Sequence, residues 1–133
     1  PNLIPIIFAA GYLGFAGIPI RPPIAITFSI CLGIAVDDSL HFLFRFWQEK
    51  KETSDLRKAI SNTIETTGLA MLTTTIVLVS GFLVITVSTF IPTAQFGIIS
   101  AITLSVALIT DITLLPALLI IFPVKFFKKK NHD

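Results

Sequence analysis

The stretch LAMLTTTIVLVSGFLVITVSTFI, from Leu69 to Ile91, decides the fold because its 23 residues carry no charge. A bilayer core about 30 Å thick is crossed by about 20 residues of helix that rise about 1.5 Å each. This stretch is therefore predicted to span a membrane. Of the 133 residues, 53% are hydrophobic and 14% are charged, whereas an ordinary soluble domain carries roughly 25% charge. We expect a membrane protein and exclude soluble enzyme folds.

Three further apolar segments accompany this stretch. The proline-containing breaks at 21–23 and 91–93 turn the chain between helices. The sequence thus predicts an all-α polytopic membrane domain over residues 1–122, followed by a basic tail over residues 123–133. The expected transmembrane helices lie at about 3–20, 24–46, 69–91 and 94–122.

The chain is expected to be a piece of a longer protein. It opens on Pro1 rather than on a methionine, and its first apolar run lacks the charged flank of a signal peptide. The lysine-rich end is typical of a natural tail after a last membrane span. We therefore expect a C-terminal piece.

A polar stretch at 45–67 separates the second and third spans. Within it Leu56, Ile60 and Ile64 recur every four residues, which predicts an amphipathic helix over about 54–66 at the membrane surface. The alternative is a solvated helix that simply leads into the third span. Neither interpretation gives this stretch a catalytic role.

The basic residues predict the orientation in the membrane. Of ten lysines and arginines, five lie in the polar stretch, four lie in the tail and Arg21 stands alone on the other side. Positive charge is retained in the cytoplasm. We expect a multi-pass protein of the cytoplasmic membrane with loop 45–67 and the C-terminus inside. Topology and attraction to anionic lipid account for the lysines better than nucleic-acid binding does.

Three carboxylates inside the predicted spans are the candidate functional residues: Asp37 and Asp38 in the second span and Asp111 in the fourth. A carboxylate at the centre of a spanning helix costs about 2.5 to 3.5 kcal/mol on insertion scales, so it seldom occurs without a use. Asp37 and Asp111 lie about 20 and 26 Å below the outer ends of their spans at 1.5 Å per residue. At such similar depths they are expected to share one polar site.

Helical spacing suggests the neighbours of this site. Gly33, Asp37, His41 and Arg45 follow one another at intervals of four and form a polar stripe. Gly33 is expected to let another backbone approach, and His41 to pass protons or hold a carboxylate. Supporting hydroxyls are expected from the third span, with Thr74 among them. The fourth span presents Ser100, Thr103, Ala107 and Asp111 on one face.

Burial favours a proton on these carboxylates. Hydrocarbon disfavours the ionised form and neighbouring carboxyls disfavour double ionisation, so at least one is expected to hold a proton near neutral pH. Such a group suits coupling to a proton gradient. The alternative is that the aspartates bond to helix hydroxyls and to Arg45 and only fix the packing.

The segment Gly33-Ile-Ala-Val-Asp37-Asp38-Ser-Leu-His41-Phe-Leu-Phe-Arg45-Phe resembles the fourth helix of the resistance-nodulation-division (RND) permease superfamily, especially its MmpL-like and sterol-sensing-domain-related lipid exporters. The stretch 59–81 resembles the surface helix and fifth helix of that family. Thr110-Asp111-Ile-Thr-Leu-Leu-Pro116-Ala-Leu resembles the end of the sixth helix. The resemblance covers almost the whole chain.

The resemblance implies a protein of two pseudo-repeated halves, each with six helices and a large extracytoplasmic porter domain. This chain then corresponds to helices 3–6 or 9–12, and the lysine tail favours the second half. Members use proton influx to export lipids or other hydrophobic compounds, which makes membrane lipids, such a substrate and the rest of the polypeptide the expected partners. An oligomer stays open. By position, Asp37 and Asp38 become the proton relay, with Asp111 beside them.

Two departures from the family pattern stand out. Some of its pumps pair the aspartates with an intramembrane lysine, and these spans contain none. The other half of the protein can also carry the active carboxylates. Sodium is an alternative coupling ion, because carboxylates and hydroxyls bind either ion.

Three alternatives compete with a proton-driven exporter. One is a protein-secretion helper of the same superfamily, and another is a lipid- or sterol-sensing domain that does not pump. The third is an intramembrane aspartyl protease, whose usual Gly-x-Gly-Asp and Tyr-Asp contexts are missing. The sequence contains no metal-ligand cluster, phosphate loop or dinucleotide fingerprint. We therefore expect a secondary transporter rather than an enzyme, without a cofactor.

Overall fold

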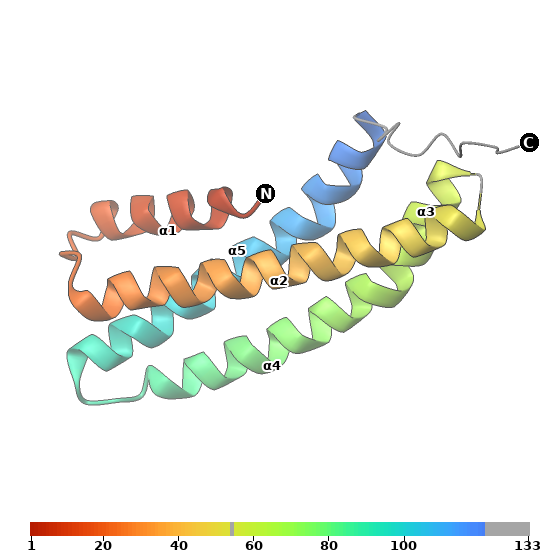
Figure 1. Cartoon of the computed structure of the whole chain (residues 1–133). Helices are drawn as coiled ribbons and strands as arrows, with labels where there is room; N and C mark the ends of the chain where they lie inside the picture. Colours follow the sequence, from red (N-terminus) through yellow and green to blue (C-terminus); the bar gives the residue numbers. More distant parts are fainter. Residues whose placement is uncertain (54, 122–133) are drawn as a thin grey trace, which may run out of the picture.

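The described residues, 1–53 and 55–121 of a computed structural model, form an all-α bundle. Its long helices are α2 (Pro22–Glu52), α4 (Leu69–Ile85) and α5 (Ile91–Ile121). Figure 1 shows α2 and α5 running in one direction, with the shorter α1 (Leu3–Phe15) and α4 running the opposite way. Helix α5 packs against α1, α2 and α4 and is the centre of the bundle.

Helix α1 is shorter than the expected span at 3–20. It ends at Phe15 because Gly17 adopts a left-handed conformation with φ 64°. The amide of Ile18 then donates to the carbonyl of Leu13 at 3.0 Å, and the amide of Gly17 to that of Gly14 at 3.3 Å. These two bonds define a Schellman motif, which closes a helix where glycine tolerates positive φ.

Helix α2 is longer than the expected span at 24–46. It begins at Pro22 because the first helical turn needs no backbone amide donors, which proline lacks. It continues past Phe46 for more than a turn, to Glu52. At 31 residues it is about 46 Å long, which exceeds the thickness of a bilayer core.

The expected surface helix at 54–66 and the third span form one helical rod. Helix α3 (Leu56–Thr63) passes through a π-helical turn, η1 (Ile64–Gly68), into α4. No proline or cap interrupts the backbone at this junction, and the Thr66 hydroxyl donates to the carbonyl of Asn62 at 2.8 Å. The rod ends at Ile85 instead of Ile91, and a short turn then leads into α5.

Helix α5 crosses α4 closely near its start. A Cβ atom on Gly97 would lie 2.6 Å from the carbonyl oxygen of Phe82, so this position requires glycine. The rings of Phe82 and Phe96 meet edge to face beside it, with centroids 5.7 Å apart. The expected fourth span at 94–122 lies within α5 up to Ile121, whereas Phe122 and the tail at 123–133 lie outside the described residues.

Two apolar clusters hold the bundle together. One joins the end of α2 to α3, α4 and the end of α5. The other joins α1 to the starts of α2 and α5. The first contains Phe42, Phe46, Ala59, Ile60, Met71, Leu115 and Leu119, and the second contains Leu13, Ile24 and Ile99.

Three stretches of the described chain have the length and apolar composition needed to cross a membrane: 22–52, 56–85 and 91–121. Helix α1, at 13 residues, is apolar but shorter. Large apolar side chains cover the outside of the bundle, and Phe15 is 95% exposed. Exposed apolar surface of this extent suits lipid rather than water.

Candidate functional site: a buried carboxylate between three helices

The carboxylate of Asp111 lies in the interior of the bundle, and only 2% of the residue is exposed. The hydroxyl of Ser39 on α2 donates to Asp111 Oδ1 at 3.0 Å. Ser39 Oγ also lies 2.7 Å from Oδ1 of Asn2, which immediately precedes α1. The site therefore joins α1, α2 and α5.

One oxygen of Asp111 has no partner within the described residues. Its Oδ2 is buried and accepts no hydrogen bond from them. An unpaired buried charged oxygen is costly, because it loses water without compensation. The site is thus suited to a carboxyl group that carries a proton or meets a cation.

The face of α5 that carries Asp111 is buried as its spacing predicts. Ser100 and Thr103 are each 1% exposed. The Thr103 hydroxyl donates to the carbonyl of Ile99 at 2.7 Å, which satisfies it within its own helix. Asp111 is consequently the charged group on a face of small and internally bonded side chains.

Asp37 lies on a different face of α2 from Ser39. Its side chain is 72% exposed, and its Oδ1 lies 3.6 Å from Nε2 of His41, whose side chain is 70% exposed. Gly33 is exposed too, and no atom of the described chain lies within 4 Å of where its Cβ would be. The part of the polar stripe formed by Gly33, Asp37 and His41 therefore points away from the described helices, and the close backbone approach expected at Gly33 does not occur among them.

Asp38 is half-buried, between the exposed Asp37 and the buried Ser39. The structure brings Asp38, rather than Asp37, towards Asp111, with Ser39 as the direct link between α2 and α5. The expected sharing of one site by Asp37 and Asp111 does not hold within the described chain. The reason is helical geometry, since Asp37 and Ser39 point about 200° apart around α2.

Arg45 pairs with Glu49 rather than with the aspartates. Its Nη2 lies 2.7 Å from Oε1 of Glu49. The other oxygen of Glu49 accepts from the side-chain amide of Asn62 at 2.9 Å. These three residues tie the end of α2 to α3, so Arg45 stabilises the joint between these helices.

Thr74 does not reach the carboxylates. Its side chain is exposed on α4, and its hydroxyl donates to the carbonyl of Met71 at 3.0 Å. Threonine in a membrane helix commonly satisfies its hydroxyl in this way.

Ser39, Asn2 and Glu49 are polar residues that the sequence analysis missed. Ser39 and Glu49 belong to a second stripe on α2, where buried residues recur at intervals of three or four. That periodicity was available as a signal, but Asn2 has none because it is brought in from another helix. The buried stripe consists of Ile24, Thr27, Cys31, Ala35, Ser39, Phe42, Phe46 and Glu49.

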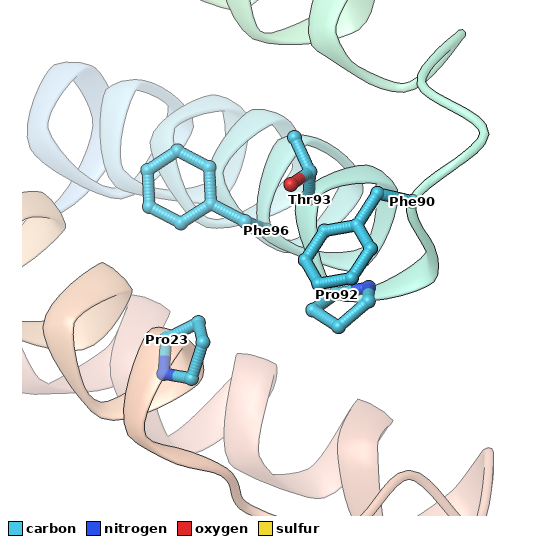
Figure 2. A pocket seen from close by; sticks show the side chains of 5 residues that line it. All are labelled: Pro23, Phe90, Pro92, Thr93 and Phe96. Atoms are coloured by element: carbon cyan, nitrogen blue, oxygen red, sulfur yellow. The ribbon is translucent and has the colours of Figure 1, made fainter.

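A small pocket of about 140 Å³ lies at the other end of the bundle. Figure 2 shows Pro23 at the start of α2 on one side and, on the other, side chains from the start of α5 and the turn before it. The pocket is mostly apolar, and Thr93 is about 27 Å along α5 from Asp111 at 1.5 Å per residue. It is therefore separate from the carboxylate site. The lining residues are Pro23, Phe90, Pro92, Thr93 and Phe96.

No group of three or more histidine, cysteine, aspartate or glutamate side chains within residues 1–53 and 55–121 is arranged to hold a metal ion. The polar chemistry of these helices thus centres on single carboxylates and hydroxyls. Such groups move protons or bind small cations. They lack the donor set of a structural metal centre.

The long apolar helices, with a carboxylate buried between them, define a polytopic membrane protein. Residues 21–132 match the model of the MMPL family. The chain belongs to this family and, with it, to the RND superfamily of membrane permeases.

Two relatives extend this assignment. The chain is 32% identical over 121 residues to MJ1562 of Methanocaldococcus jannaschii, which is named as a membrane protein; the match covers 91% of this chain and 31% of that protein. It is 31% identical over 102 residues to the hopanoid transporter HpnN of Rhodopseudomonas palustris, covering 72% of this chain and 11% of HpnN. The chain thus spans a third or less of either relative. No solved structure matches it.

Proposed function

We propose that this chain is the membrane part of an exporter of lipids or other hydrophobic compounds that is driven by the proton-motive force. Asp37, Asp38 and Asp111 act as its proton relay, with H⁺ as the coupling ion. The proposal is supported by membership of the MMPL family and by similarity to a hopanoid transporter. The observation that carries it is the buried, half-paired carboxylate of Asp111 inside a membrane-spanning helix.

The position of Asp111 supports a role in proton transfer rather than in packing alone. A carboxylate that only fixes packing has both oxygens paired, because each unpaired buried oxygen is costly. Asp111 has one bonded oxygen and one buried oxygen without a partner in the described chain. A carboxyl of this kind gains from taking up a proton.

The proposal also accounts for the exposed polar residues Asp37 and His41 on α2. Asp37 and His41 are polar groups on a helix that crosses the membrane, yet both point outward. Polar side chains at this depth normally face other protein or water. We assign this face to contact with the remainder of the same polypeptide, including the other membrane half, whose porter domains select the substrate.

The orientation forms part of the proposal. The loop at 45–67 and the C-terminus lie in the cytoplasm, since nine of the ten basic residues gather on that side. The turns before Pro22 and Ile91 then face outward, and the protein resides in the cytoplasmic membrane.

The proposal is tested by carbodiimide labelling of the protein in native membranes over a pH series, mapped by mass spectrometry. Carbodiimides react with protonated, buried carboxyls, so we expect labelling of Asp111 or Asp38 that falls as the pH rises through neutrality. The Asp111→Asn variant controls for site assignment. Absence of labelling at every pH, with a reactive control protein in the same membranes, would overturn the relay.

Substrate and driving force are tested separately. The purified protein is reconstituted in phosphatidylcholine vesicles that contain a fluorescent hopanoid-like polycyclic lipid, and an imposed pH gradient is the only energy source. We expect lipid movement that stops when the gradient is collapsed by a protonophore. Movement that persists without the gradient would contradict proton coupling.

A further inference from the structure

The hydrogen bonds at Asp111 raise a question of proton counting. Three side-chain oxygens follow one another, from Asn2 Oδ1 to Ser39 Oγ at 2.7 Å and on to Asp111 Oδ1 at 3.0 Å. Each contact is short enough to be a hydrogen bond, and each needs one hydrogen. The serine hydroxyl supplies one hydrogen only, and the amide oxygen of Asn2 supplies none. With Asn2 facing Ser39 through its oxygen, the second hydrogen comes from a protonated Asp111; with the amide turned over, Asn2 supplies that hydrogen and Asp111 is ionised.

We propose that Asn2 and Ser39 are positioning residues that hold the transferable proton on Asp111 through a hydrogen-bond chain whose direction reverses when the proton leaves. The inference rests on the proposed function, because it specifies how one of the relay carboxyls is controlled. In the protonated state Asp111 donates to Ser39, and Ser39 donates to the oxygen of Asn2. In the ionised state the amide group of Asn2 turns over and donates to Ser39, and Ser39 donates to Asp111.

Both states keep the two hydrogen bonds that link Asn2, Ser39 and Asp111 Oδ1, while Asp111 Oδ2 has no partner among the described residues. The proton leaves from the carboxyl oxygen, and the electron pair of that O–H bond stays on Asp111 as its charge. No bond other than O–H is broken, and the Asn2 amide needs only a rotation about its side chain. An Asn side chain is suited to this because one face presents an acceptor and the other a donor.

These hydrogen bonds also couple the protonation of Asp111 on α5 to the start of α1. Asn2 stands at the start of α1, which packs mainly against α5. The contact between Asn2 and Ser39 brings this end of α1 to α2, and Figure 1 shows the start of α1 above the middle part of α2. A change in hydrogen-bond direction at Ser39 therefore turns the amide of Asn2 next to α1 and requires no large movement of the helices.

The charged and titratable groups around Asp111 come from the helices packed on α5. A charge on Asp38 of α2 opposes a negative charge on Asp111. Asp37 and His41 point outward, and α4 carries no charged side chain. The thiol of Cys31 lies against Ser100, 11 residues or about 16 Å along α5. None of these groups takes the place of Asn2 or Ser39 in the series of hydrogen bonds that ends at Asp111.

Two substitutions are expected to move the proton affinity of Asp111 in opposite directions. Asn2→Ala leaves the Ser39 hydroxyl hydrogen without its acceptor in the protonated state, whereas in the ionised state that hydrogen still bonds Asp111 and only a lone pair of Ser39 loses its partner. The protonated state therefore loses more, and the pH of half-labelling by carbodiimide falls. Ser39→Ala removes the described donor to ionised Asp111, so the pH of half-labelling rises. Loss of the hydrogen bond to the charged carboxylate in Ser39→Ala predicts a shift of about one pH unit, and Asn2→Ala, which removes a bond between neutral groups, is expected to shift the profile by less.

The experiment measures this pH of half-labelling at Asp111 in the complete protein in native membranes. Ser39→Thr keeps the hydroxyl and is expected to retain the wild-type profile, which controls for disturbed packing. In the double variant Asn2→Ala/Ser39→Ala the profile is expected to match that of Ser39→Ala alone, because Asn2 acts only through Ser39. Asn2 is half-buried, and its described side-chain contact is the one with Ser39, so its replacement is compatible with folding.

The outcomes separate this inference from the proposed function. Shifts of Asn2→Ala and Ser39→Ala in the same direction, or no shift in Asn2→Ala, overturn the hydrogen-bond chain while a pH-dependent wild-type profile keeps the relay. Failure of wild-type Asp111 to be labelled at any pH overturns both the inference and its part in the relay.

Discussion

Gly97 on α5 faces the carbonyl oxygen of Phe82 on α4 so closely that an added Cβ would lie 2.6 Å from it. The same Cβ would lie 3.2 Å from the backbone nitrogen of Thr86. The closest of these atoms belongs to the backbone of α4, which cannot rotate away as the end of a flexible side chain can. This contact sets how near α4 and α5 approach each other.

Gly97→Ala is expected to push the two helices apart and destabilise the protein by about 1 to 3 kcal/mol, the usual cost of overpacking. The thermal midpoint in detergent micelles measures the effect. Gly81→Ala is the matched control, because no described atom lies within 4 Å of its Cβ position. Equal midpoints for the two variants would contradict the close approach.

Glu49→Ala is expected to loosen the joint between α2 and α3. Glu49 is buried and bonds both Arg45 and Asn62, so its loss leaves two polar groups without their partner. The side chain of Arg45 is 41% exposed, and solvent reduces the value of its ion pair. We expect a loss of about 1 to 2 kcal/mol.

Glu65→Ala serves as the control for Glu49→Ala. Glu65 is exposed, and its contact with the Ser61 hydroxyl is long at 3.4 Å. Its replacement is expected to change the free energy of unfolding by less than about 0.5 kcal/mol. Chemical denaturation in mixed micelles compares the two variants, and similar losses would show that the joint does not depend on Glu49.

Asp37 and Asp111 lie in different environments, but Asp37→Asn and Asp111→Asn are expected to have the same effect on transport. Asp37 is exposed and its described contact is His41, so Asp37→Asn leaves the stability of these helices within about 0.5 kcal/mol. Asp111→Asn keeps an acceptor for Ser39 but cannot release a proton. Both variants are expected to abolish gradient-driven lipid movement in vesicles, and a wild-type rate in either one would remove that residue from the relay.

The proposed orientation predicts which side each loop faces. In a Cys31→Ser background, Arg21→Cys is expected to react with an impermeant maleimide in intact cells. Lys58→Cys is expected to react only after the membrane is permeabilised. The pattern follows from the retention of positive charge in the cytoplasm. Labelling of Lys58→Cys in intact cells would invert the topology.

Much of the helical architecture follows from composition alone. The uncharged run at 69–91 and the apolar run that contains Asp111 are too long and too apolar for other structures, because a membrane leaves no water for unpaired backbone groups. Helix ends were harder to predict. The observed ends of α1 and α2 differ from the predicted ones because Gly17 terminates α1 and Pro22 begins α2. Each acts through local backbone geometry, which hydropathy does not measure.

The inward face of α2 was decided by tertiary structure. Its sequence offers one stripe with Asp37 and His41 and another with Cys31 and Ser39, and both fit the helical period. Packing against α5 buried the second stripe and left the first exposed. The polar character of a stripe does not indicate which neighbour it meets.

By itself the sequence determined that this chain is a membrane protein of helices with carboxylates inside the bilayer, because charge is costly there and the pattern of apolar runs is plain. Tertiary structure alone decided that Asp111, Ser39 and Asn2 form one site. Ser39 lies on α2, Asp111 lies on α5 and Asn2 immediately precedes α1; Ser39 is separated from Asn2 and Asp111 by 37 and 72 positions. Contacts over such distances depend on how the helices pack, which no local pattern of residues encodes.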